Sequence, residues 1–223
     1  MSIKSESPVK GVMKRLERNA EMDEFFSKEL DDAGYGGVDI QRTPLGTRIT
    51  LFVNRPGLVI GRRGVGIRTL TDTVAEKFGL PNPTISVTEI EQPDLDPRIV
   101  SGRIVHTISR GIAFRRAAQF AKNAVMRAGA LGVEIEIKGK LRSERARYEK
   151  FREGILPKSG DTAQRMVRKA TKHLLGKMGL SGVTVSIAIK DALPEEFRLL
   201  EPKTTKTTDD KGEEIKITED KIE

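Results

Sequence analysis

A glycine-spaced turn between two periodic segments constrains the fold of this chain more than any other feature. Upstream of it, residues 48–54 alternate apolar and polar side chains, as a half-buried strand does. Downstream, residues 65–78 place apolar side chains on one helical stripe, and Gly79 marks the end of that helix. The turn itself consists of Gly61, Arg62, Arg63 and Gly64. The chain is therefore expected to pass from a strand through a glycine turn into a helix.

This turn has the properties of a contact for a nucleic-acid backbone. Glycines lack Cβ atoms, so a sugar-phosphate chain can approach them closely. The helix that follows points its free amides and its positive dipole end at the turn, which favours phosphate. Arg62 and Arg63 add two positive charges. The alternative is an ordinary strand-to-helix turn whose arginines face water. Neither a dinucleotide-binding fingerprint nor an NTPase phosphate loop fits the glycine spacing.

The charge distribution favours a polyanionic partner. The chain has 223 residues, with 40 Lys and Arg against 32 Asp and Glu, and a net charge of +8. Residues 98–133 carry seven basic side chains and no acid, and residues 138–177 carry 13 basic and four acidic ones. Solvated surfaces usually mix both signs, which the first stretch does not. Nucleic acid is the commonest partner of such a surface.

Composition argues against several other classes of function. Cys is absent, which excludes a disulfide framework, a zinc knuckle and a thiol nucleophile, and fits a reducing compartment. The two histidines, His106 and His173, lie far apart, so neither a metal nor another cofactor is expected. Residues 1–8 lack the apolar block of a secretory signal, and no apolar run has the roughly 20 residues of a membrane span. Asp94 and Asp96 are explained more simply by a turn and a helix cap than by a catalytic pair.

Helical periodicity predicts one helix near the N-terminus and two in the middle of the chain. The first covers residues 8–33, and the second begins at Asp96-Pro97 and runs to about Arg110. After a break at Gly111, the third covers about residues 112–128 and has one apolar and one uninterrupted cationic face. The cationic face has two rows, Arg115, Gln119 and Lys122 in one and Arg116, Asn123 and Arg127 in the other.

Strict alternation predicts strands over residues 133–138 and 183–189, and a weaker pattern predicts another over 148–156. On the first of these, Glu134 and Glu136 face one way and are expected to be solvated or paired with arginine. Residues 161–177 fit either a helix, with Met166, Ala170 and Leu174 on one face, or a strand. Residues 201–223 are rich in Lys, Thr, Asp and Glu and are expected to be a disordered tail.

The order helix, strand, strand, Gly-x-x-Gly turn, helix, strand resembles a type II KH domain over residues 1–95. Three later stretches resemble the small-subunit ribosomal protein S three family, archaeal type: residues 112–117 (IAFRRA), 139–146 (GKLRSERA) and 151–157 (FREGILP). The resemblance covers roughly residues 10–200 in order. It implies an α+β fold with a three-stranded KH sheet packed by helices, then a second α/β domain with a mostly antiparallel sheet over 96–200. It also implies that residues 161–177 are mostly strand.

The resemblance further implies a non-enzymatic, cytoplasmic constituent of the small-subunit head. Family members contact rRNA and head proteins of the S ten and S fourteen families. They also line the mRNA entrance channel, beside the S four and S five families. There a basic helix grips mRNA and helps to unwind it, and the two arginines credited with this match Arg115 and Arg116. A third basic position of bacterial members matches the neutral Gln119, and Lys122, one turn along, is the candidate substitute.

The expected RNA-binding surface combines the glycine turn, the basic helix and the connection that follows the strand over 133–138. Its members are Gly61, Arg62, Arg63, Gly64, Arg115, Arg116, Gln119, Lys122, Arg127, Lys140, Arg142, Arg145 and Arg147. The last four alternatively belong to an ordinary charged helix interleaved with Glu144 and Glu149. Two other functions stay open: an abasic-site lyase or endonuclease, for which no lysine is singled out, and a free KH-type regulator of mRNAs.

Overall fold

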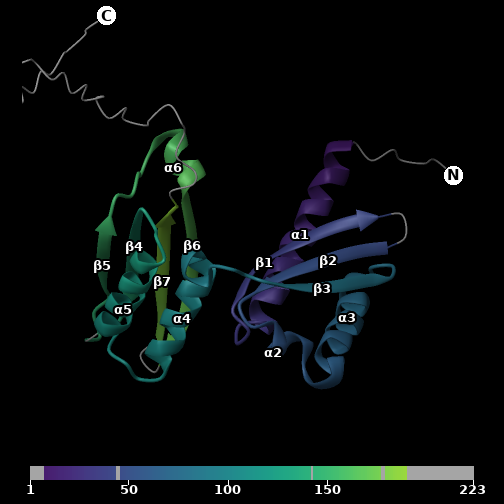
Figure 1. Ribbon diagram of the computed structural model, residues 1–223, viewed down its shortest axis with the longest axis horizontal. Coiled ribbons are helices and arrows are strands. Elements are labelled where there is room, and N and C mark those ends of the chain that lie inside the picture. The colour runs from purple at the N-terminus through teal and green to yellow at the C-terminus, as the bar shows by residue number, and fades with distance from the viewer. Residues whose placement is uncertain (1–7, 44–45, 142, 177–178, 190–223) are drawn as a thin grey trace, which may run out of the picture. The chain divides into compact units, whose positions relative to one another are not determined.

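The computed structural model describes residues 8–43, 46–141, 143–176 and 179–189, which form two sheets with accompanying helices (Figure 1). The first part of the chain contains α1 (Pro8–Glu29), β1 (Tyr35–Thr43), β2 (Gly46–Val53), α2 (Pro56–Ile60), α3 (Val65–Phe78) and β3 (Pro83–Glu89). The second contains α4 (Pro97–Ser109), α5 (Phe114–Arg127), β4 (Gly132–Gly139), β5 (Arg147–Gly154), α6 (Gly160–Met166), β6 (Val167–Gly176) and β7 (Gly179–Ala188). Single 3₁₀ turns at Arg62–Gly64 and Pro93–Leu95 complete the order.

The N-terminal sheet has the strand order β1-β2-β3 and mixes two kinds of pairing. β1 runs antiparallel to β2, whereas β3 runs parallel to β2. Parallel neighbours need a crossover connection, which α2, the glycine turn and α3 supply. Pro56 at the first position of α2 fits this start because its fixed φ suits the first helical turn. The glycine turn therefore sits inside the crossover, as the resemblance to a KH domain implies.

One face of the N-terminal sheet carries the core. Ile49, Leu51 and Val53 of β2 are fully buried, whereas Arg48 and Phe52 are exposed on the alternate positions and Thr50 is half-buried. Met22 and Phe26 of α1, with Val59 of α2 and Val74 of α3, complete the same cluster. Phe25 of α1 meets Phe78 of α3 edge to face, with ring centroids 5.9 Å apart. The helices therefore share one face of the sheet, and this packing fixes both ends of the turn between α2 and α3.

The second sheet has the order β5-β4-β7-β6, and all of its pairings are antiparallel. Its inner face holds Val133, Ile135 and Ile137 of β4, which alternate with Glu134 and Glu136 as predicted. The helices α4 and α5 supply the rest of this core, and three apolar residues of β7 join it: Val183, Val185 and Ile187. The resemblance implied a mostly antiparallel sheet in this region, and the structure confirms it.

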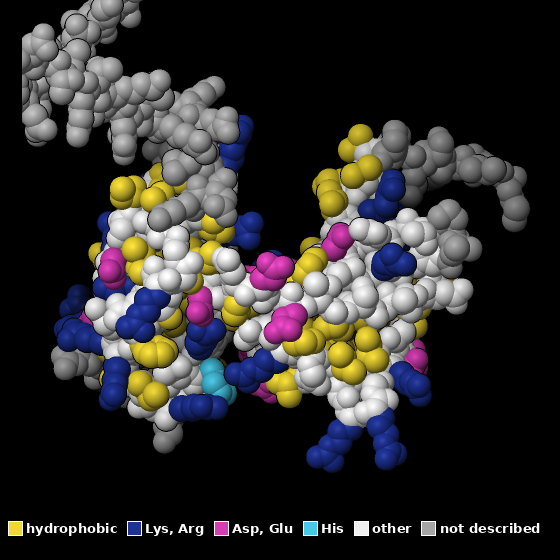
Figure 2. Space-filling view, in the orientation of Figure 1, with side chains coloured by type: hydrophobic (Ala, Val, Ile, Leu, Met, Phe, Trp, Pro, Cys, Tyr) yellow, Lys and Arg dark blue, Asp and Glu magenta, His cyan; other side chains and the backbone are white. Residues whose placement is uncertain are grey.

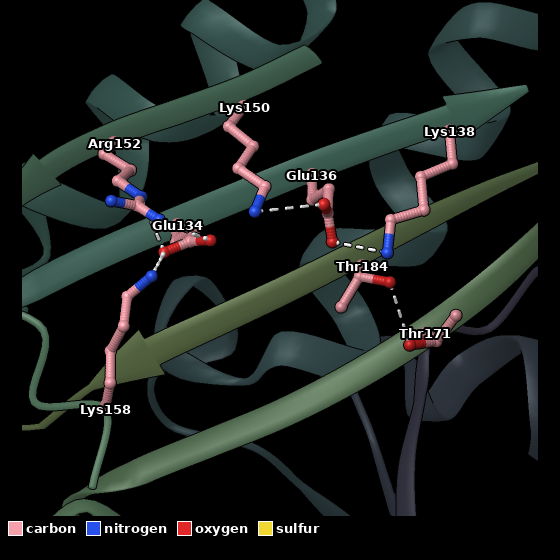
Figure 3. A network of polar contacts seen from close by, with 8 residues as sticks. All are labelled: Glu134, Glu136, Lys138, Lys150, Arg152, Lys158, Thr171 and Thr184. Atoms are coloured by element: carbon pink, nitrogen blue, oxygen red, sulfur yellow. Dashed lines mark hydrogen bonds and ion pairs between the residues drawn. The ribbon is translucent and has the colours of Figure 1, made fainter. Parts of the chain in front are cut away.

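The opposite face of this sheet is an ion-pair network (Figure 3). Glu134 and Arg152 are direct cross-strand partners, with the carboxylate 2.7 Å from Nε, and Lys158 approaches the same carboxylate at 3.5 Å. Glu136 pairs with Lys138 at 2.8 Å and with its cross-strand neighbour Lys150 at 3.3 Å. The hydrogen bond from Lys138 lowers the pKa of Glu136 against the opposing effect of burial. The two glutamates are therefore paired, as predicted, although with lysines as well as arginine.

Three sequence predictions need correction or fall outside the described residues. The N-terminal helix ends at Glu29 rather than Ala33. The helical alternative for residues 161–177 is wrong from Val167 onward, because helix α6 gives way there to β6, which pairs with β7 along its whole length. Strand pairing thus overrides a periodicity that fitted both structures. The predicted tail over 201–223 lies outside the described residues.

Candidate nucleic-acid interface

The Gly61–Gly64 turn adopts backbone conformations that favour glycine. Gly61 has φ 69° and Gly64 φ 76°, and Arg63 shares this unusual region with φ 54°. The amide of Gly61 donates to the carbonyl of Gly57 at 3.1 Å, which closes α2. The side chains of Arg62 and Arg63 are exposed. Figure 2 shows Lys and Arg side chains projecting from the end of the N-terminal domain where Figure 1 places the α2–α3 turn.

The start of α3 is left open towards this turn. Gly64 is the N-cap residue, no side chain caps the helix, and its first turn carries no acid. The amide of Val65 donates to the carbonyl of Arg62, and the dipole of α3 adds partial positive charge at this end of the helix. Gly66 brings α3 close to α2, because a Cβ atom at this position would lie 2.6 Å from the carbonyl oxygen of Val59. The predicted elements of a phosphate contact are thus brought together at one end of this domain.

Helix α5 has the dry face that the sequence predicts. Ala117, Ala118, Ala121 and Val125 are buried, and the last three belong to the core that α5 shares with α4 and β4. The predicted binding residues Arg115, Arg116, Gln119 and Arg127 are exposed, and Lys122 is partly buried. Four of the five predicted residues of this helix are therefore exposed to solvent.

The first predicted row of α5 is paired with carboxylates of β5. Arg115 donates from Nε to Glu149 Oε2 at 2.8 Å and from Nη2 to Oε1 at 2.6 Å. Lys122 lies 3.0 Å from Glu153 Oε2. The hydrogen bonds and charge of Glu149 raise the pKa of the Arg115 guanidinium, which thus stays protonated throughout the physiological range. The prediction of an uninterrupted cationic face is wrong here, because neighbouring acids partly neutralise this row.

The second row of α5 is open to solvent and contains one residue, Phe120, in addition to the three that the sequence predicts. Arg116 and Arg127 form no ion pair with any residue that the structure describes. Phe120 lies between them with 69% of its surface exposed. Sequence reasoning missed Phe120, although its position four residues after Arg116 places it on the charged side of the helix. The open part of the helix surface is therefore cationic and aromatic rather than cationic alone.

The connection between β4 and β5 carries the remaining predicted residues. Lys140, Arg145 and Arg147 are exposed, and Arg147 opens β5. Arg142 lies outside the described residues. The described residues of this connection form bends rather than a helix, so the alternative of a charged helix is wrong for them. Lys140 and Arg145 therefore stand on a loop and Arg147 at the start of a strand, and all three are accessible to a phosphate.

The described residues form neither a metal site nor a pair of catalytic aspartates. No cluster of three or more His, Asp or Glu side chains there has a geometry suited to a metal ion. Asp94 pairs with Arg103, and the Asp96 carboxylate accepts from the amide of Arg98 at 2.8 Å as the cap of α4. The two aspartates thus have the structural roles that the sequence predicted for them. No described helix is long and apolar enough to span a bilayer.

Comparisons with known proteins agree with this arrangement. Residues 21–95 match the family model of the KH domain, and residues 104–187 match the model described as ribosomal protein S3, C-terminal domain. The small ribosomal subunit protein uS3 of Methanococcus maripaludis strain C5 is 43% identical over 84% of this chain and 90% of that protein. The uS3 protein of Methanocaldococcus jannaschii is 45% identical over 81% of this chain and 87% of that protein. The uS3 protein of Ignicoccus hospitalis is 37% identical over 91% of this chain and 85% of that protein. These matches confirm the resemblance that the motifs indicated, including its archaeal type.

Proposed function

The chain belongs to the ribosomal protein S3 family, and on that premise we propose that it is a non-enzymatic, RNA-binding constituent of the small ribosomal subunit. Within the subunit head, the glycine turn of the KH domain holds rRNA. The helix α5 lines the mRNA entrance channel, grips incoming mRNA and helps to unwind it. The protein is thus ribosome-bound in the cytoplasm, with head proteins of the S ten and S fourteen families and channel proteins of the S four and S five families as neighbours.

The observation that carries this proposal is the open row of α5. Arg116 and Arg127 are exposed without an acid partner among the described residues, and Arg115 stands one residue before Arg116. RNA that moves through a machine must be held without regard to sequence, and every nucleotide offers the same phosphate charge. Guanidinium groups suit this task because they stay charged and bind phosphate through two parallel hydrogen bonds. Their position on a packed helix keeps the grip in one place while the RNA moves.

The experiment that tests this role replaces Arg115 and Arg116 together with Ala in ribosomes that translate a message containing a stable hairpin. Neither side chain belongs to the core, so we expect subunits to assemble normally. Passage through the hairpin should slow, and translation of an unstructured message should not change. Arg165→Ala on α6 removes one exposed charge elsewhere on the same domain and serves as the control. Unchanged passage of the double variant through the hairpin would remove α5 from the unwinding step.

A free KH-type regulator is separated from this proposal by sedimentation. A constituent of the subunit should remain with the ribosomal fraction after a moderate salt wash. A regulator that visits messages should stay largely in the soluble fraction under the same conditions. Recovery of most of the protein in the soluble fraction would overturn the proposed ribosomal role.

A further inference from the structure

Phe120 is the most exposed aromatic side chain among the described residues, ahead of Tyr148 at 65%. Phe25, Phe26 and Phe78 pack in the N-terminal core, whereas Phe120 leaves 69% of its surface in water on the polar side of α5. A single exposed apolar side chain is common on protein surfaces, so Phe120 points to a partner only through its place between two cations on a predicted RNA-binding helix. The sequence has eight Phe, two Tyr and no Trp, so aromatic side chains are scarce in this chain.

The surroundings of Phe120 are cationic and hydrophilic. By helix geometry Arg116 lies about 6 Å before it along the axis and Arg127 about 10 Å after it. Asn123, three residues on, shares the same side and is exposed. No acid occurs between residues 98 and 133, and the carboxylates of β5 that reach α5 bind Arg115 and Lys122 of the neighbouring row. The ring is therefore framed by positive charge without local neutralisation.

We propose that Phe120 is a stacking platform for the bases of single-stranded RNA, while Arg116 and Arg127 hold the phosphates on either side of it. This inference rests on the proposed role of α5 in gripping mRNA and adds the part of the RNA that the helix recognises. A ring offers its face to any base, so the contact is independent of sequence. A base inside a duplex is stacked on its neighbours and offers no free face. The platform thus favours strands that have already been separated.

The charge around Phe120 favours RNA over a protein partner. A helix that docks on a protein surface presents a stripe of apolar side chains at steps of three, four and seven residues. Here the positions around Phe120 on the exposed side carry Arg116, Asn123 and Arg127. A single ring between two cations matches the combination of aromatic platform and positive groove that binds single strands. A protein partner remains an outcome of the test.

The test uses the full chain carrying Arg62→Asp and Arg63→Asp, which reverse the charge of the glycine turn and leave α5 and the connection between β4 and β5 as the predicted RNA contacts. Asp tolerates the left-handed backbone of position 63. Three probes of about 12 nucleotides are titrated: oligoadenylate, an abasic strand with the same phosphates, and an RNA duplex. Phe120→Ala and Phe120→Tyr are compared with the parent. Circular dichroism and the unfolding midpoint of each variant show whether it is folded.

If the proposal is right, Phe120→Ala weakens oligoadenylate binding roughly 5- to 150-fold, as expected for one lost base stack. Binding of the abasic strand and of the duplex stays within twofold, and the salt dependence is unaltered because no phosphate contact is lost. Phe120→Tyr keeps the ring and retains the affinity. An equal loss on the abasic strand, or no loss on oligoadenylate, would overturn the stacking role, and the second result would point to a protein partner.

Failure of the proposed function gives a different pattern. If α5 does not grip RNA, any binding of the three probes comes from other basic residues, and Arg116→Ala leaves all three titrations unchanged. If α5 grips RNA through phosphates alone, Arg116→Ala weakens all three probes and Phe120→Ala weakens none. The two proposals are therefore tested separately by the same set of titrations.

Discussion

Arg115 of α5 and Glu149 of β5 form a bidentate ion pair, with N–O distances of 2.8 and 2.6 Å. The pair stands beside Arg116, which has no such partner among the described residues. The family resemblance assigns one role to these two consecutive arginines, but within the part of the chain that the structure describes only Arg115 is paired with a carboxylate. Arg116 can bind a phosphate directly. Arg115 must either release the carboxylate of Glu149 to bind a phosphate, or bind the carboxylate with one edge of its guanidinium group and the phosphate with the other. Exposed pairs of this kind are weak, so the exchange is feasible on an RNA surface.

Replacing Glu149 with Gln should strengthen RNA binding by a few-fold. The change keeps the shape of the side chain but removes the charge that competes with phosphate for Arg115. One further phosphate contact should steepen the salt dependence on single-stranded RNA by about 0.7. Titrations of a labelled single strand at several salt concentrations measure both quantities.

The control for this change is Glu24→Gln on α1, which removes an acid of equal charge that is paired with Lys28. It should alter affinity only through the net charge. If both variants gain the same affinity for RNA, the gain is a general effect of net charge, and the Arg115–Glu149 pair does not limit RNA binding.

Replacing Arg62 with Ala should reduce the salt dependence of RNA binding without altering the fold. The side chain is exposed beside the start of α3, which no side chain caps, so its loss removes the proposed phosphate contact and no packing. The slope should fall by about 0.7 to 1 unit. The measurement is the same salt series with the wild-type turn as reference. An unaltered slope would place this side chain away from the RNA backbone.

Much of the architecture was predictable because local signals agreed with tertiary packing. Alternation located β4 and β7, whose apolar residues face the helices. Asp96-Pro97 located the start of α4, where the carboxylate caps the helix. The glycine turn was predictable because its backbone requires glycine at both ends. Each of these features is decided within a few residues of sequence.

The parts that sequence reasoning missed depend on distant strands. Glu149 and Glu153 reach α5 because β5 pairs with β4 in a register that no local pattern reports, with Glu149 opposite Ile137 and Glu153 opposite Val133. The change from helix to strand at Val167 depends likewise on pairing with Ala188 of β7. Phe120 differs from these, because its helical position alone placed it on the charged side of α5.

The cap of α4 makes a prediction about pH. Burial of the Asp96 carboxyl raises its pKa above the ordinary value, against hydrogen bonds from the amides of Arg98 and Ile99. The unfolded chain therefore ionises first, near pH 3.9. This group's contribution to stability is then greatest below that pH and decreases until the pH exceeds the folded pKa. Asp96→Asn keeps the cap without the charge and should remove this decrease, which unfolding curves measured from pH 3 upward would reveal.

The variant Asp96→Ala separates the cap from the charge. It lacks both the acceptor for the Arg98 amide and the titration, so its free energy of unfolding should lie about 0.5 to 2 kcal/mol below that of Asp96→Asn at every pH. Equal stability of the Asn and Ala variants would mean that the cap contributes nothing to α4.

Two glycine-to-alanine changes should have opposite effects on stability. At Gly66 the new Cβ atom would lie 2.6 Å from the carbonyl oxygen of Val59 and 3.1 Å from that of Ile60, so α2 and α3 must separate. Overpacking of this kind lowers the free energy of unfolding by about 1 to 3 kcal/mol. A Cβ atom at Gly11 of α1 would have nothing within 4 Å. Gly11→Ala should therefore raise the free energy of unfolding by about 0.4 to 1 kcal/mol, because alanine restricts the unfolded chain. Urea unfolding of both variants measures the difference, and a gain at both positions would show that α2 and α3 are not held in tight contact beside the turn.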